Sequence, residues 1–215
     1  MRLFLASSDF GNHVDRLKKM VGNNHKVLVV SNARDYKSKE ERDAVIEYKK
    51  KLFMENGFEF VELDLRDYFG KEKELRKFVD EQKAGLVALM GGNTFMLRRA
   101  LSQSGFDKIL KDDLSKDKYM LTGDSAGAIV ATPSLRGYER MDKENVLAPK
   151  YQKEVIWDGL GLTDVRVIPH ADSPKYDKQV IEIREKLFDK NGWDYVVLND
   201  SDVYVIDGEK KEVLR

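Results

Sequence analysis

Apolar and polar positions alternate along the chain in blocks typical of strands and helices that follow one another. Short apolar runs predict strands, and longer segments with apolar residues three and four apart predict amphipathic helices. The predicted strands cover residues 3–6, 26–30, 58–63, 86–90, 119–122, 165–168, 195–198, 203–206 and 212–214. The predicted helices cover residues 15–21, 38–55, 71–82, 95–101, 106–110 and 175–190, with one more starting at 128. This alternation predicts an α/β fold with a doubly wound, mostly parallel sheet sandwiched by helices, in one catalytic domain over residues 1–215.

Local signals mark the ends of several elements. Ser38 followed by Glu41 matches a capping box, and Gly57 ends the same helix. Asp207-Gly208 predicts a hairpin turn between the last two strands. The residues of the capped helix expected to face the core are Val45, Tyr48, Leu52 and Phe53. Residues 133–157 have weaker periodicity and are predicted to be mostly loop.

Composition restricts the possible partners and chemistry. The 215 residues include 38 basic and 38 acidic side chains, so the net charge gives no reason to expect nucleic acid or an anionic membrane as a partner. With no cysteine, the chain cannot use disulfides, thiolate metal sites or a cysteine nucleophile. The apolar start of the chain is too short for a signal peptide or a membrane span, so we expect a cytoplasmic protein.

The pentapeptide Gly123-Asp124-Ser125-Ala126-Gly127 lies between a predicted strand and a predicted helix. A serine between small residues at such a turn has the layout of a nucleophile elbow, which exposes its hydroxyl at the edge of the sheet. The next amide, that of Ala126, would point to the position of a substrate oxyanion. A turn that only packs a helix on a sheet could have the same pattern, so the rest of the chain must decide.

A serine nucleophile needs a base, and histidine is the usual one. His13 and His25 lie in polar stretches and are expected at the surface. His170 follows a predicted strand and Pro169, at the same edge of the sheet as Ser125. The alternative is a histidine satisfied by the backbone, but the elbow favours His170 as the base.

A carboxylate usually orients such a histidine. Asp200 follows the predicted strand 195–198 and could reach the same edge. Glu139, Asp142 and Asp172 compete with it, and each of the four could instead be a surface charge.

The glycine pair Gly91-Gly92 follows another predicted strand. Glycines let the backbone approach a substrate, so Gly91, Gly92 and Asn93, together with Ala126, are the expected oxyanion and substrate-binding residues. A phosphate cradle would require a following lysine and hydroxyl residue, which this turn lacks. Neither a dinucleotide fingerprint nor zinc-binding spacing is present, and the predicted chemistry requires no metal or organic cofactor.

These motifs resemble the peptidase E family of serine peptidases, which includes aspartyl dipeptidases and cyanophycinases. The matching positions are Gly91-Gly92-Asn93-Thr94-Phe95, Leu97, Gly123-Asp124-Ser125-Ala126-Gly127-Ala128, Pro133, Arg136 and Pro169-His170. The resemblance implies a fold similar to class I glutamine amidotransferases, whose nucleophile at this elbow is cysteine. It also implies that Ser125 is the nucleophile and His170 the base. The family's late acidic residue matches Asp200, and a second acidic position falls at about Glu139 or Arg140.

One position departs from the family pattern. Members that cleave after an N-terminal aspartate carry an arginine on the helix beyond the histidine, which pairs with the substrate carboxylate. Asp177 aligns there, with Lys175 and Lys178 as neighbours. An acidic side chain would repel an aspartyl group, which weakens the expectation of that preference.

The function that we expect is a serine exopeptidase, similar to dipeptidase E, that hydrolyses short peptides through an acyl-enzyme on Ser125. Its partner is the peptide substrate, and the chain is expected to be a monomer or a homodimer. One alternative is an esterase of the α/β-hydrolase type, although that fold places its histidine last, after the acid. A binding module that keeps the fold without the reaction is the other alternative.

Overall fold

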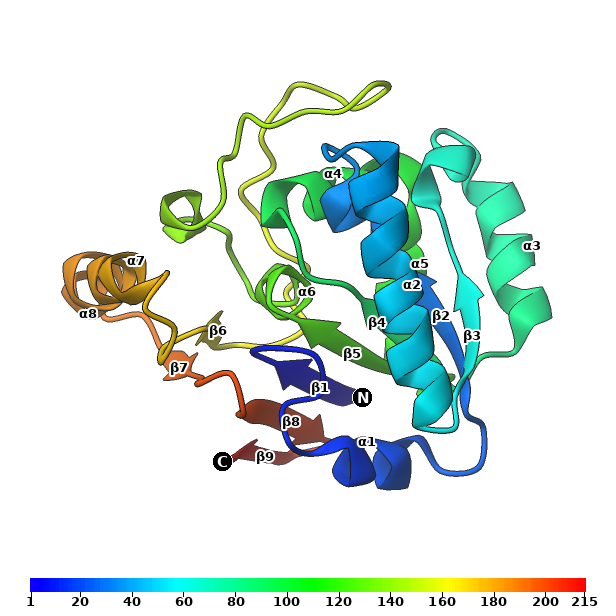
Figure 1. Cartoon of the computed structure of the whole chain (residues 1–215), viewed down its shortest axis with the longest axis horizontal. Helices are drawn as coiled ribbons and strands as arrows, with labels where there is room; N and C mark the ends of the chain where they lie inside the picture. Colours follow the sequence, from blue (N-terminus) through cyan, green and yellow to red (C-terminus); the bar gives the residue numbers. More distant parts are fainter.

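The computed structural model describes all residues from 1 to 215. A seven-stranded sheet forms its centre, in the order β3-β2-β4-β5-β1-β8-β9, and a separate sheet pairs β6 with β7 (Figure 1). The strands are β1 (Arg2–Ala6), β2 (Lys26–Val30), β3 (Glu59–Glu62), β4 (Leu86–Leu89), β5 (Met120–Asp124), β6 (Arg166–Ile168), β7 (Tyr195–Val197), β8 (Val203–Asp207) and β9 (Lys210–Leu214). The first five pair in parallel, whereas β8 and β9 are antiparallel, so the sheet is mostly parallel, as predicted.

Helices cover both faces of this sheet, as the alternating pattern predicted. The α-helices are α1 (Val14–Val21), α2 (Lys39–Glu55), α3 (Glu72–Gln82), α4 (Thr94–Ser104), α5 (Phe106–Ser115), α6 (Ala126–Val130), α7 (Asp177–Ile183) and α8 (Asp189–Asn191). Short 3₁₀ turns are η1 (Asn32–Arg34), η2 (Leu65–Tyr68) and η3 (Tyr138–Arg140), and a π-helical turn, η4 (Arg184–Phe188), joins α7 to α8. None of the helices combines the length and apolar character needed to cross a membrane.

The two faces of the sheet have separate cores because side chains alternate along each strand. In β1, Phe4 and Ala6 pack with residues of α1 and α2, such as Leu17 and Phe53. Leu3 and Leu5 point to the opposite face, which α3, α4, α5 and α6 cover. All residues of β2 and β4 except Lys26 are buried, which explains why these strands are continuous apolar runs.

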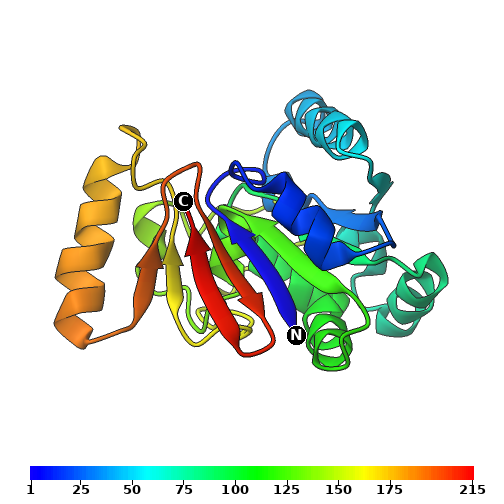
Figure 2. The same cartoon turned by 90° about the horizontal axis from the view of Figure 1, so that it is seen from below.

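The small β6–β7 sheet lies beside the β8–β9 hairpin, with α7 on its outer side (Figure 2). The sequence predicted both strands but expected the strand before His170 to belong to the main sheet. A third core joins this part to the elbow helix, since Ile168 and Val180 pack in one cluster with Ile129. His170 therefore approaches the main sheet from a separate sheet.

Helix α2 differs from the predicted pattern. Its capping box is present, with Ser38 Oγ accepting from the N–H of Glu41 and the Glu41 carboxylate accepting from the N–H of Ser38. The predicted inward position Tyr48 is 52% exposed, whereas Lys49 is buried. Hydrophobic periodicity could not reveal this, because a lysine is normally assigned to the exposed face.

Smaller corrections concern the ends of three elements and the position of His25. Helices α4 and α5 extend three and five residues beyond their predicted ends, to Ser104 and Ser115. The hairpin turn lies one residue later than predicted, because Asp207 pairs with Lys210. His25 is not a free surface residue, since its ring packs 5.3 Å from that of Phe58.

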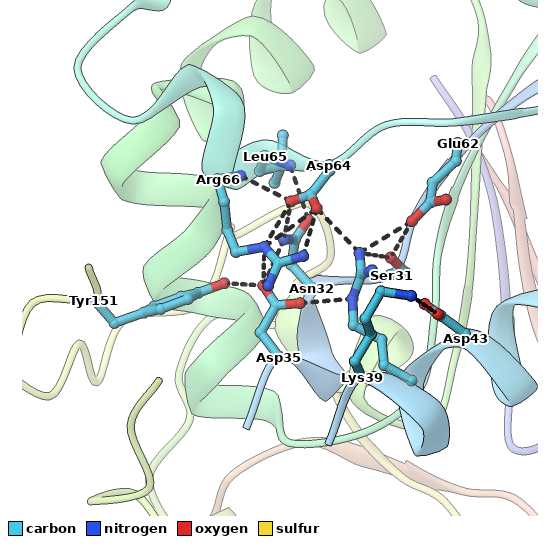
Figure 3. A network of polar contacts seen from close by, with 11 residues as sticks. Ser31, Asn32, Asp35, Lys39, Asp43, Glu62, Asp64, Leu65, Arg66 and Tyr151 are labelled. Atoms are coloured by element: carbon cyan, nitrogen blue, oxygen red, sulfur yellow. Dashed lines mark hydrogen bonds and ion pairs between the residues drawn. The ribbon is translucent and has the colours of Figure 1, made fainter. Parts of the chain in front are cut away.

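A polar network fixes the carboxyl ends of β2 and β3 (Figure 3). Asp35, whose side chain is completely buried, accepts hydrogen bonds from Arg42 Nε at 2.9 Å and from the Tyr151 hydroxyl. Arg66 joins Asp35 to Asp64 (Figure 3). The network thus ties α2, η2 and the loop around residue 151 to η1, which borders the functional site.

Candidate active site

Ser125 stands at a strained turn between β5 and α6. Its backbone angles are φ 49° and ψ −110°, outside the usual regions for a residue with a side chain. A Cβ at Gly123 would lie 2.5 Å from the carbonyl carbon of Gly127, and a Cβ at Gly127 would lie 2.0 Å from the oxygen of Leu89. Both glycines are therefore required for the tight turn that raises the serine hydroxyl above the sheet edge.

A continuous hydrogen-bond chain links the three predicted catalytic side chains. His170 Nε2 lies 2.8 Å from Ser125 Oγ, and His170 Nδ1 lies 2.6 Å from Asp200 Oδ1. When Nδ1–H donates to Asp200, Nε2 is free to accept the serine proton. His170 also has a positive φ of 62°, and its ring stacks on that of Tyr176 at 4.9 Å. This arrangement can deprotonate the serine hydroxyl.

The side chains of Ser7 and Asp172 hold this hydrogen-bond chain in place. Ser7, directly after β1, accepts a hydrogen bond from the His170 N–H at 2.7 Å and donates to Asp200 Oδ1 at 3.1 Å. Asp172 accepts from the Asp200 N–H at 2.8 Å. Sequence reasoning considered Asp172 only as a rival of Asp200 and missed Ser7, although Ser7 follows a strand that ends at the same edge.

The other acidic candidates are occupied elsewhere. Glu139 accepts from the N–H of Gly137 at 2.6 Å, within its own turn. Asp142 lies in the cleft but accepts from both the N–H and the hydroxyl of Thr94. Burial raises the pKa of Asp142, and hydrogen bonds from Thr94 offset this only in part. Of the four carboxylates, Asp200 is the one that contacts the histidine ring.

The predicted oxyanion residues divide into two groups. The Gly92 N–H has no hydrogen-bond partner, and the Ala126 N–H lies in the first turn of α6, where no helical carbonyl accepts it. The Gly91 N–H is already taken by Asp124 Oδ2 at 3.2 Å. Asn93 is buried and caps α4. Its side-chain Oδ1 accepts from the N–H of Met96, and its Nδ2 donates to the carbonyl of Lys143. Two free amides thus remain for an oxyanion, and Asn93 acts as a helix cap.

Ser125, His170 and Asp200 open into one cleft of about 670 Å³. Arg34 from η1 also lines it, and its buried Nε has no hydrogen-bond partner. Asp177, aligned with the family's substrate-binding arginine, is exposed at the start of α7 and does not line the cleft. Sequence reasoning did not identify Arg34 as a cleft residue. The only indication was its position shortly after β2.

The buried Lys49 and two partly buried carboxylates complete the cleft wall. Lys49 contacts Asp9 at 2.6 Å and Asp124 at 2.9 Å. No group of three or more histidine, aspartate or glutamate side chains is arranged to hold a metal ion. The cleft thus combines a serine–histidine–aspartate chain, two free amides and several charged groups.

Known proteins are similar to this chain in sequence and in fold. An uncharacterized peptidase of Pasteurella multocida is 27% identical over 191 residues, which cover 87% of this chain and 84% of that protein. An uncharacterized peptidase of Listeria innocua is 30% identical over 98 residues, and this match spans 45% of the chain and only 44% of the relative. Both names state the class of reaction but no substrate.

Solved structures agree in fold. A Listeria monocytogenes protein described as a candidate peptidase E superposes with a TM-score of 0.79 at 22% identity, covering 100% of this chain and 98% of the other. A peptidase from an acI-B1 actinobacterium gives 0.71 at 17% identity, covering 99% and 86%. The sequence profile of peptidase family S51 matches residues 3–214. The chain therefore belongs to peptidase family S51, a family of serine-type peptidases and hence of hydrolases.

Proposed function

We propose that the chain is a serine exopeptidase, similar to dipeptidase E, that hydrolyses short peptides through an acyl-enzyme on Ser125. The observation that carries this proposal is the hydrogen-bond chain from Ser125 through His170 to Asp200, with distances of 2.8 and 2.6 Å. Family membership supports peptide hydrolysis as the reaction.

The first half of the reaction forms the acyl-enzyme. Ser125 Oγ attacks the scissile carbonyl while its proton passes to His170 Nε2, and Asp200 stabilises the imidazolium that forms. The carbonyl oxygen becomes an oxyanion, which the N–H groups of Gly92 and Ala126 stabilise. When the tetrahedral intermediate collapses, His170 returns the proton to the leaving amine.

The second half repeats this sequence with water. His170 takes a proton from a water molecule, which attacks the ester carbonyl of the acyl-enzyme. The same two amides hold the second oxyanion, and collapse releases the acid product and restores the Ser125 hydroxyl. These residues supply the acid–base and electrostatic catalysis of both steps.

Charges in the cleft suggest which short peptides it accepts. His170 must face the leaving amine, so the acyl residue lies on the opposite side of Ser125, toward the end of β2. Arg34 lines that side without an ion pair and can bind an acidic side chain on the N-terminal residue. Lys175, on the histidine side, can bind the C-terminal carboxylate of a dipeptide. We therefore favour dipeptides with an acidic N-terminal residue.

Serine trapping tests the mechanism. A fluorophosphonate should add to the wild-type protein once, as read by intact mass, and should not add to Ser125→Ala. Ser125→Ala should also lose all turnover of a dipeptide library while its unfolding curve stays close to wild type. Wild-type turnover in Ser125→Ala, or a folded wild-type protein that is never labelled, would reject the proposal.

Isosteric dipeptides test the substrate preference. The wild-type protein should have a kcat/KM about 10-fold higher for Asp-X than for Asn-X, because a hydrogen bond to a charged group contributes about 1.5–3 kcal/mol and a neutral one about 0.5–1.5 kcal/mol. Arg34→Gln should remove this ratio and leave Asn-X turnover nearly unchanged. Arg140→Gln is the matched control, since Arg140 pairs with Glu182 on the surface outside the cleft. An unchanged ratio in Arg34→Gln would contradict the assignment.

A further inference from the structure

Lys49 is a buried cation in the cleft wall that the reaction described above does not use. Its side chain is 7% exposed, and its Nζ bridges Asp9, which follows β1, and Asp124, which precedes the nucleophile. The Tyr48 hydroxyl donates to the other oxygen of Asp9 at 2.7 Å, and Arg34 lies on the same side of the cleft. A lysine from α2 thus reaches the residue next to Ser125.

The burial of Lys49 must be compensated by other interactions, because desolvation penalises a buried charge. Burial alone would lower the pKa of Lys49, but the carboxylates of Asp124 and Asp9 outweigh it and raise the pKa above its ordinary value. Lys49 therefore stays charged and balances one of the two carboxylates beside it. Without Lys49, the Asp124 carboxylate, which is only 17% exposed and next to the nucleophile, would lose its ion-pair partner.

The second carboxylate oxygen of Asp124 connects Lys49 to the oxyanion site. Asp124 Oδ2 accepts from the Gly91 N–H at 3.2 Å, and a Cβ at Gly91 would lie only 2.8 Å from this oxygen. The next amide, that of Gly92, is the free donor described above. The position of the Asp124 carboxylate therefore fixes the turn that aims the Gly92 N–H.

We propose that Lys49 is a positioning residue for the oxyanion site, which acts by neutralising Asp124 and holding its carboxylate on the Gly91 amide. This inference rests on the proposed serine mechanism. Negative charge on the substrate oxygen develops only as Ser125 attacks, so an unbalanced Asp124 opposes the transition state more than the bound substrate. Loss of Lys49 should therefore lower kcat more than it changes KM.

Dipeptide kinetics and serine labelling test this role together. In Lys49→Met, kcat should fall by at least about 10-fold while KM stays within about threefold. Lys49→Arg keeps the positive charge and should recover part of kcat. Lys51→Met is the matched control on the same helix, because Lys51 is exposed and pairs only with Glu55 at 3.7 Å, and it should leave kcat unchanged.

Labelling by a fluorophosphonate separates this inference from the proposed peptidase activity. Ser125 Oγ attacks the phosphorus, its proton passes to His170, and the P–F bond breaks to release fluoride. The reaction needs the oxyanion site but no peptide. The labelling rate of Lys49→Met should fall about 10-fold relative to wild type. If the wild-type protein is labelled but hydrolyses no peptide, the proposed function fails, and this rate ratio still decides the role of Lys49.

A double variant distinguishes charge balance from general packing. Asp124→Asn removes the negative charge and keeps an acceptor for Gly91, so Lys49→Met with Asp124→Asn should be labelled several-fold faster than Lys49→Met alone. Urea unfolding identifies the folded variants, and Lys49→Gln replaces Lys49→Met if the latter does not fold. A folded Lys49 variant labelled at the wild-type rate, or a double variant as slow as the single one, would overturn the inference.

Discussion

At the scale of single residues, the site depends on the tautomer of one imidazole. Asp200 fixes the His170 ring through the contact to Nδ1, and Ser7 and Asp172 hold Asp200 and the His170 backbone. Ser125 and His170 both have positive φ values, 49° and 62°. Two strained residues that face one another indicate that the surrounding contacts, rather than local preference, hold the geometry.

Asp200→Asn should lower kcat by about 10²–10⁴-fold with little change in KM. An asparagine can donate to Nδ1, which favours the tautomer with the proton on Nε2, where it cannot accept from Ser125. Steady-state kinetics on the best dipeptide measure the effect. Glu139→Gln is the control, because Glu139 bonds only within its own turn, and it should keep wild-type kcat. Equal rates in Asp200→Asn and wild type would remove Asp200 from the mechanism.

The residues that sequence reasoning found share one property: each comes shortly after a predicted strand, although the strands before His170 and Asp200 form a separate sheet. Ser125, His170 and Asp200 came from this rule, and the structure brings their side chains together. Lys49 and Asn93 could not be interpreted correctly this way. Burial of Lys49 depends on carboxylates from two distant segments, and Asn93 resembles a binding residue until its amide is seen to cap α4.

At the scale of elements, the central strands were predictable because β1, β2, β4 and β5 are short apolar runs in which almost every residue is buried. The division into two sheets was not predictable. Strands β6 and β7 have three residues each, and nothing in their sequence excludes pairing with the main sheet. Their position depends on a separate core around Ile168 and Phe188. The π-helical turn between α7 and α8 likewise has no pattern of its own in the sequence.

The polar network that joins β2, β3 and α2 stabilises the fold less as the pH becomes acidic. Burial alone would raise the pKa of Asp64, but hydrogen bonds from Arg66 and Asn32 outweigh it and lower the pKa to about 2. Because the folded pKa lies below the unfolded value of about 3.9, this stabilisation is complete above about pH 5 and is lost as pH falls toward 2. The carboxylate thus contributes about 2 kcal/mol at neutral pH.

Asp64→Asn should therefore be less stable than wild type at pH 6, and the difference should shrink by about 2 kcal/mol at pH 2. Urea unfolding at several pH values gives the two free energies. Asp67→Asn is the control, since Asp67 is exposed on the same turn and its carboxylate accepts no hydrogen bond, so its difference from wild type should stay constant. A constant difference for Asp64→Asn would contradict the role of the network.

At the scale of the whole molecule, a buried arginine makes several of the contacts that hold a long irregular segment, residues 141–157, to the helical layer. Arg99 of α4 is 1% exposed and donates to the carbonyls of Glu144, Lys153 and Glu154 at 2.8–3.3 Å. The segment also carries Asp142, which lines the cleft. The sequence predicted a loop here but could not predict its contacts with Arg99, because the pattern of side chains does not indicate which distant backbone carbonyls a residue will bind.

Arg99→Met should lower the free energy of unfolding by at least about 3 kcal/mol, because three backbone carbonyls lose a buried charged donor and each hydrogen bond to a charged group contributes about 1.5–3 kcal/mol. Urea unfolding measures this loss, and limited proteolysis should show faster cleavage between residues 141 and 157. Arg136→Met is the control: Arg136 is exposed and stacks on Trp157 at 5.0 Å, so its loss should cost at most about 1 kcal/mol. If both variants unfold alike and resist the protease equally, the segment owes its position to apolar packing, and Arg99 is not its anchor.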